Sequence, residues 1–166
     1  MTAALACLVG HAQAQHAPEN QLKAALIYNF VLFTEWPRAS LPDGDPLILC
    51  VAKNTVVTEA LGQLEQKPIA GHAVKIKAWS ENDDWQACKV VYIENDERFR
   101  LPQIRKKLEG LSVLIISDKP GAIDEGAMIA IAVENNRFIF DINASAAHQA
   151  RLNISSKLLR LARKVL

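Results

Sequence analysis

Three short, continuous apolar segments constrain the fold of this chain more than any other feature of its sequence. They span residues 46–53, 88–94 and 112–117. Apolar runs of this length are typical of parallel strands that are buried on both faces of a sheet. We therefore predict an α/β fold with a mixed, largely parallel central sheet and helices on both faces.

Helices are predicted between these strands, together with one half-exposed strand. The first helix spans residues 18–36, the second runs from a cap at Asn54 or Thr55 to about residue 66, and the third spans about residues 101–108. Residues 73–79 alternate apolar side chains with lysine, which is typical of a strand with one exposed face.

The last third of the sequence predicts a C-terminal β-hairpin followed by two helices. Glu134-Asn135-Asn136 separates the strands 128–133 and 137–142, and asparagine tolerates the positive φ of a tight turn. Asn143 is placed to cap a helix that runs to about residue 150. The predicted final helix, residues 154–165, carries one apolar stripe, formed by Ile154, Leu158, Leu161 and Val165.

The composition indicates one globular domain preceded by a leader. Half of the 166 residues are apolar and the formal net charge is +1, so nothing attracts the whole chain to nucleic acid. Residues 1–14 are small and apolar and end in Ala12-Gln13-Ala14, which resembles the end of a secretory signal peptide. We expect residues 15–166 to form the exported domain. No later apolar run has the roughly 18 residues that a membrane span needs.

The predicted first helix carries the candidate contact residues for a partner or a second copy. Residues 24–33 are apolar on almost every face, interrupted only by Asn29. Such a helix must be covered on most sides by its own core or by a partner, and a second copy in a homodimer would supply such a surface. Asn29 is either a partner anchor or a clamp inside the fold, and Trp36 is either a binding anchor or a lid on the core. The full set of candidates is Tyr28, Asn29, Phe33, Glu35 and Trp36.

Two cysteines remain once the predicted leader is removed. Cys50 and Cys88 both belong to predicted strands, and in an oxidising compartment such a pair is usually bridged. Two buried free thiols are the alternative. A zinc site is not expected, because the chain has no CxxC pair and no clustered histidines.

No catalytic constellation is recognisable. The chain lacks a glycine-rich nucleotide loop, a GxSxG elbow and an HExxH helix. Neighbouring carboxylates such as Asp83-Asp84 lie in predicted loops, where carboxylates usually face solvent. We therefore predict no catalytic residue, no metal and no cofactor. From residue 142 onward the chain carries no acidic residue but five basic ones, which form either a solvated face or a surface for acidic lipid or an acidic partner: Arg151, Lys157, Arg160, Arg163 and Lys164.

Several separated blocks resemble the YfiR family of periplasmic regulators. They are the first helix KAALIYNFVLFTEWP, the strand ending at Cys50, the segment 126–129 and the closing run 152–159. A further block spans residues 137–143. Matching motif residues are Arg137, Phe140, Asp141, Asn143, Ser155, Ser156 and Lys157.

This resemblance implies a non-enzymatic periplasmic protein that binds the periplasmic sensor region of a membrane-bound GGDEF diguanylate cyclase. Repression of that cyclase would lower cyclic di-GMP and biofilm formation. The family is also linked to redox control, and Cys50 and Cys88 match one of its disulfide pairs. A second pair found in some relatives is absent from this sequence. The alternative prediction is a small-molecule-binding domain, with a ligand pocket formed by the loops after the parallel strands.

Overall fold

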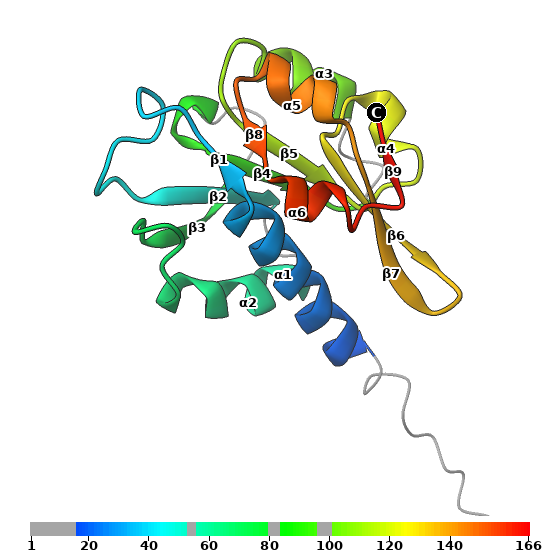
Figure 1. Ribbon diagram of the computed structural model, residues 1–166. Helices are drawn as coiled ribbons and strands as arrows, with labels where there is room; N and C mark the ends of the chain where they lie inside the picture. Colours follow the sequence, from blue (N-terminus) through cyan, green and yellow to red (C-terminus); the bar gives the residue numbers. More distant parts are fainter. Residues whose placement is uncertain (1–15, 53–55, 80–83, 96–100) are drawn as a thin grey trace, which may run out of the picture.

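A seven-stranded mixed sheet forms the centre of the computed structural model, which describes residues 16–52, 56–79, 84–95 and 101–166 (Figure 1). The predicted leader and the predicted cap at Asn54 or Thr55 lie outside these residues. The strand order is β3-β2-β4-β5-β6-β7-β9. The strands are β2 (Leu47–Ala52), β3 (Val74–Trp79), β4 (Val90–Ile93), β5 (Leu114–Ser117), β6 (Ile129–Glu134), β7 (Arg137–Ile142) and β9 (Lys164–Val165).

Pairing in this sheet is parallel from β3 to β6, as the continuous apolar runs predict. Only β7 runs antiparallel to its neighbour β6, and β9 then pairs parallel to β7. The chain moves outward from β2 to β3 and then returns to β4 on the other side of β2. The predicted mixed, largely parallel sheet is confirmed.

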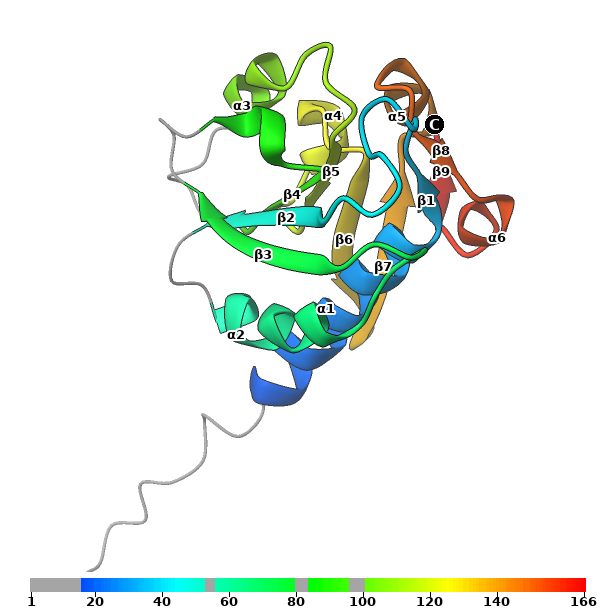
Figure 2. The same cartoon turned by 90° about the vertical axis from the view of Figure 1, so that its left-hand side faces the viewer.

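Helices cover both faces of the sheet and enclose two apolar cores. On one face, α1 (His16–Leu32) and α2 (Val56–Gly62), which continues as the 3-10 turn η1 (Gln63–Gln66), pack in a core that also includes side chains of α5 (Ala144–Gln149) and α6 (Ser156–Leu159). On the other face, α3 (Leu101–Lys107), α4 (Ala122–Glu125) and the 3-10 turn η2 (Trp85–Ala87) cover the second core (Figures 1 and 2).

The first helix is shorter than predicted. It ends at Leu32, and Thr34 and Glu35 form the short strand β1 (Thr34–Glu35), which pairs antiparallel with β8 (Asn153–Ile154). The backbone N–H of Ser155 donates to the Phe33 carbonyl at 2.9 Å, which extends the same pairing. Pairing with a distant segment thus competes successfully with another helical turn, and Pro37 disfavours that turn in any case.

Within its own chain, α1 buries only one of its faces. Its buried side chains follow a single stripe: Ala24, Ile27, Phe30 and Val31. The opposite side is open, with Leu22 53% exposed, Leu32 41% exposed and Asn29 at the surface. Spacings of three and four residues place the buried positions on one helical face.

The predicted final helix over residues 154–165 is replaced by β8, α6 and β9. Ile154 and Leu158 are buried, but Leu161 is 70% exposed and Val165 is 46% exposed, so the predicted stripe does not form. Backbone bonds explain the difference, because the N–H groups of Arg163 and Leu166 donate to carbonyls of β7. By contrast, the hairpin and the helix after it are confirmed: Asn135 and Asn136 have positive φ, and the Asn143 side chain caps α5.

Candidate functional site

A disulfide joins Cys50 and Cys88, with their Cα atoms 5.8 Å apart. Cys50 lies within β2, and Cys88 lies two residues before β4. Because β2 and β4 are adjacent parallel strands paired at Leu49 and Val90, the two cysteines are brought together. Both are almost completely buried and belong to the same core as Trp79 and Trp85. The predicted pairing is therefore present in the structure.

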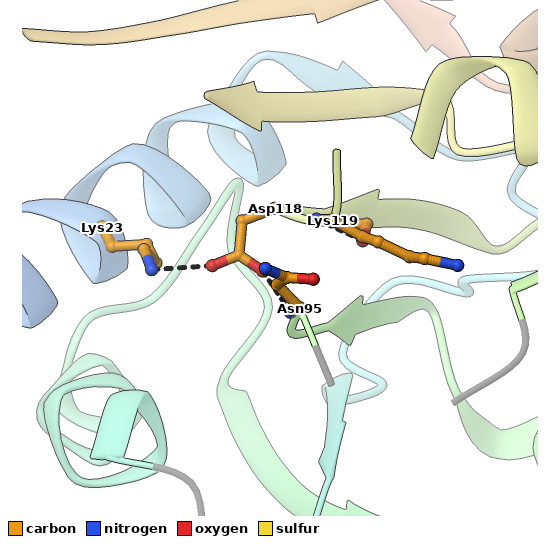
Figure 3. A network of polar contacts seen from close by, with 5 residues as sticks. Lys23, Asn95, Asp118 and Lys119 are labelled. Atoms are coloured by element: carbon orange, nitrogen blue, oxygen red, sulfur yellow. Dashed lines mark hydrogen bonds and ion pairs between the residues drawn. The ribbon is translucent and has the colours of Figure 1, made fainter. Parts of the chain in front are cut away.

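A polar cluster lies where β4 and β5 end (Figure 3). Asp118, directly after β5, accepts a 2.7 Å hydrogen bond from the Lys23 ammonium group of α1. Its other carboxylate oxygen accepts a 2.7 Å bond from the backbone N–H of Asn95, just after β4. The Lys23 and Asp118 side chains are only 14% and 13% exposed. This ion pair ties α1 to the carboxyl ends of two central strands.

Tyr92, in β4, is close enough to Asp118 for that carboxylate to affect its hydroxyl. Its side chain is 1% exposed, and burial raises the pKa of its hydroxyl far above the ordinary value, with the nearby charges of Asp118 and Glu94 acting in the same direction. A tyrosine held neutral in this way is a core group and not a general base. Next to the cluster, Lys119 pairs with Glu125 through both carboxylate oxygens, at 2.9 and 2.8 Å.

Each charge in this cluster is matched by a partner, so the arrangement stabilises the fold and offers no poised nucleophile. Among the described residues, no group of three or more histidine, cysteine or carboxylate side chains is placed to hold a metal ion. Within the same ranges, no helix is both long and apolar enough to cross a membrane.

The five predicted contact residues differ in burial and in hydrogen-bond partners. Tyr28, Phe33 and Trp36 are half-buried against the main core, and the Trp36 indole N–H donates to the Lys89 carbonyl at 3.2 Å. Asn29 is exposed, and its amide donates to the Ala25 carbonyl of its own helix. Glu35 is exposed on β1 and accepts a 3.1 Å bond from the Asn153 amide.

The family-motif residues serve mainly local structure. Phe140 packs on Phe30 of α1 with ring centroids 4.8 Å apart, and Asp141 forms a salt bridge with Arg163. This exposed pairing raises the pKa of the Arg163 guanidinium, chiefly through its hydrogen bonds to Asp141. Asn143 caps α5, and Ser155 caps α6 through the N–H of Lys157. Arg137, Ser156 and Lys157 have exposed side chains.

The β6–β7 hairpin extends beyond its neighbours in the sheet and forms a projecting arm (Figure 1). β5 pairs with β6 only at Ile129 and Ala130, and β9 pairs with β7 only at its last two residues. Beyond these positions, the outward backbone groups of β6 have no strand partner within the described residues. Strand length, which sets this overhang, is poorly defined by sequence patterns.

Apolar side chains on the arm are only partly covered. Successive pairs across β6 and β7 are Ile129 with Ile142, Ile131 with Phe140, and Val133 with Phe138. The first two pairs are buried, whereas Val133 is 58% exposed and Phe138 is half-buried. The apolar face of the sheet therefore continues past the elements that cover it.

A groove of about 720 Å³ lies between α3, α4 and α5. Its lining includes the buried side chains of Val113, Ile115 and Met128, with Arg105 exposed at its border. The Arg105 stem passes over Gly126, where an added Cβ would clash with the arginine Cδ. The spacing of apolar residues could not have located this groove, because three separate elements form it.

The fold defines an α/β protein with a mixed, largely parallel sheet between two layers of helices. It is similar to the structure of the ABC domain in complex with L-Trp from Streptococcus pneumonia, with a TM-score of 0.53 and 13% identity. The match covers 89% of this chain and 62% of that chain, and at this identity it shows the fold alone. No curated protein sequence matches the chain.

A YfiR/HmsC-like family model matches residues 20–163. The chain therefore belongs to the YfiR/HmsC-like family, which confirms the resemblance seen in its sequence blocks. The proteins of this family are periplasmic regulators and not enzymes, and membership implies a role in diguanylate cyclase signalling.

Proposed function

We propose that this protein is exported, loses residues 1–14, and represses a membrane-bound GGDEF diguanylate cyclase by binding its periplasmic sensor region. Repression would lower cyclic di-GMP and with it biofilm formation. The observation that carries this proposal is the family match over residues 20–163. In the polar cluster, Lys23 pairs with Asp118 and Lys119 pairs with Glu125. This internal pairing agrees with a protein that acts by surface contact.

The open side of α1 is the surface that we assign to the cyclase. Leu22 and Leu32 are exposed there on either side of Asn29, and Tyr28 is half-buried beside them. Apolar side chains around one amide provide the apolar centre and the directional contact that protein interfaces use. The Lys23–Asp118 ion pair holds this helix in position on the sheet.

A homodimer is also proposed, on a basis that differs from the sequence prediction. α1 buries one face within its own chain, and its open side is assigned above to the cyclase, so α1 is not the basis for the homodimer. The β6–β7 arm supplies the reason instead, since Val133 is exposed beside a strand edge that lacks a partner within the described residues. Unpaired edges of this kind readily accept another strand.

The test is capture followed by reconstitution. The protein is immobilised and incubated with solubilised inner membranes, and captured GGDEF proteins are identified. The identified cyclase is then assayed for cyclic di-GMP synthesis with and without added protein. We expect inhibition that is weakened at least tenfold by Leu32→Asp, with Lys77→Asp on the far strand β3 as an exposed control. Failure of every captured cyclase to be inhibited would contradict the proposal.

Small-molecule binding is the second candidate function, and the groove between α3, α4 and α5 favours it. Its volume of about 720 Å³ falls within the usual range of ligand pockets. The similar ABC domain was solved in complex with L-Trp, so this amino acid is the first probe to use. A rise in melting temperature with L-Trp that disappears in Arg105→Gln would support this function, and the absence of any shift would count against L-Trp as the ligand.

A further inference from the structure

We propose that the C-terminal end of the protein docks on an anionic membrane surface. The docking surface, here called the basic tip, consists of α6, the turn after it and β9. Its functional side chains are Lys157, Arg160, Leu161, Lys164 and Val165. This inference is independent of the cyclase, because it concerns lipid and not the sensor region.

Charge is the first observation behind this inference. Lys157, Arg160 and Lys164 are exposed, and their side chains form no hydrogen bond or ion pair with any described residue. Arg163, between them in sequence, is already paired with Asp141. No acidic residue follows Asp141 in the chain, so three cationic groups remain available on adjoining elements.

Several acidic side chains lie near this end, and most of them are engaged. Asp118 and Asp124 line the same pocket as Lys164; Asp118 is paired with Lys23, whereas Asp124 is exposed. Asp141 is occupied by Arg163, and Glu134 on the neighbouring strand also lies close enough to influence that arginine. Glu35, on the strand paired with β8, accepts a hydrogen bond from Asn153. None of these carboxylates forms an ion pair with the three free cations within the described ranges, and the tip keeps its positive charge.

Exposed apolar side chains are the second and independent observation. Leu161 is 70% exposed, Val165 is 46% exposed and Leu166 is 40% exposed, so half of the large exposed apolar side chains in the described part of the chain lie within six residues. Figure 2 shows α6 at the outer end of the molecule, so the turn that carries Leu161 is accessible to a flat surface.

Lipid fits this combination better than an acidic protein does. The centres of protein interfaces are poor in lysine and rich in aromatic residues, whereas the basic tip carries two lysines and no aromatic side chain. A projecting leucine flanked by cations is the arrangement by which proteins insert an apolar group among lipid headgroups while basic groups contact anionic lipid. The complementary partner is therefore a bilayer that contains anionic phospholipid.

Vesicle flotation with the full chain tests the proposal. Phosphatidylcholine vesicles with phosphatidylglycerol as the minority lipid are compared with pure phosphatidylcholine vesicles at low ionic strength. We expect binding only to the anionic vesicles. The triple variant K157Q/R160Q/K164Q should reduce partitioning on the order of 100-fold, since each basic group near an anionic surface contributes about fivefold. Leu161→Ser should reduce partitioning roughly tenfold.

The matched control is K67Q/K75Q/K77Q, which removes the same charge from exposed positions on and before β3, at the opposite edge of the sheet. All variants share the same first fifteen residues, so any contribution from that segment cancels. Wild-type binding that the control retains and the tip variant loses supports the proposal. Absence of binding to anionic vesicles, or equal loss in both triple variants, overturns it. If the wild type ignores vesicles but the tip variant no longer captures a cyclase, the tip binds an acidic protein and the proposal is wrong.

Discussion

The hydroxyl of Tyr92 links the stability of the protein to alkaline pH. An unfolded tyrosine ionises near pH 10, whereas burial and the charge of Asp118 raise the pKa of Tyr92 above that value in the folded chain. Above about pH 10 the unfolded state therefore loses this proton first, and stability falls as pH rises. Below that pH the contribution is fully present.

We expect Tyr92→Phe to change the unfolding free energy by less than about 1 kcal/mol at pH 7, because the shape of the side chain is kept. Between about pH 10 and 11 the stability of the variant should fall less steeply than that of the wild type. Urea unfolding followed by circular dichroism at several pH values measures both slopes. Parallel curves for the two proteins would show that Tyr92 does not carry this dependence.

Single residues with a strong local preference could be predicted from the sequence. Asn143 caps α5, Asn135 and Asn136 adopt positive φ, and Cys50 pairs with Cys88. The asparagine cap and the asparagine turn depend on conformational preferences that operate over a few residues. The disulfide could be predicted because only two cysteines follow the predicted leader. Asn29 was harder to interpret, because its environment depends on which face of α1 meets the sheet.

At the scale of elements, the Lys23–Asp118 ion pair fixes α1 to the sheet. Replacing Lys23 by Met keeps the apolar stem but leaves Asp118 mostly buried without its cationic partner, while the Asn95 N–H still donates to it. Removing one member of a buried pair leaves an uncompensated charge, so we expect a loss of about 2 to 3 kcal/mol in unfolding free energy. Thermal and chemical unfolding measure this loss.

The matched control for this prediction is Arg38→Met. Arg38 pairs with Asp43 at 3.7 Å, and these side chains are 88% and 79% exposed. An ion pair this exposed should contribute less than about 0.5 kcal/mol. Equal losses in the Lys23 and Arg38 variants would show that the position of the Lys23 pair beneath α1 has no special effect.

Element identity was more predictable than element ends. The buried strands β2, β4 and β5 follow directly from apolar runs, because both of their faces are covered. The C-terminal end of α1 and the replacement of the last helix by β8, α6 and β9 depend on backbone pairing between distant segments. β1 and β8 are over 100 residues apart, and β9 pairs parallel to β7 after α5, β8 and α6. Local propensity carries no information about such partners. The α3–α5 groove and the overhanging arm were missed for the same reason.

For the whole molecule, the disulfide constrains the unfolded chain. It joins residues separated by 38 positions, and the chain-entropy estimate for such a loop is up to about 4 kcal/mol. We expect Cys50→Ser/Cys88→Ser to lower the midpoint of urea unfolding accordingly, with little change in the far-ultraviolet circular dichroism spectrum. Addition of a reductant should lower the wild-type midpoint and leave the variant unchanged. A wild-type midpoint that is insensitive to the reductant would contradict this prediction.

The projecting arm makes the oligomeric state a test of the whole molecule. Val133 is 58% exposed at a position where β6 has no second strand neighbour within the described residues, so a charge there should disrupt a dimer without disturbing the core. We expect light scattering coupled to size exclusion to give a dimeric mass for the wild type and a monomeric mass for Val133→Asp. Ala78→Asp, at an exposed position on the opposite edge strand β3, is the control and should remain dimeric. A monomeric wild type at high protein concentration, or a dimeric Val133→Asp, would exclude the arm as the contact between copies.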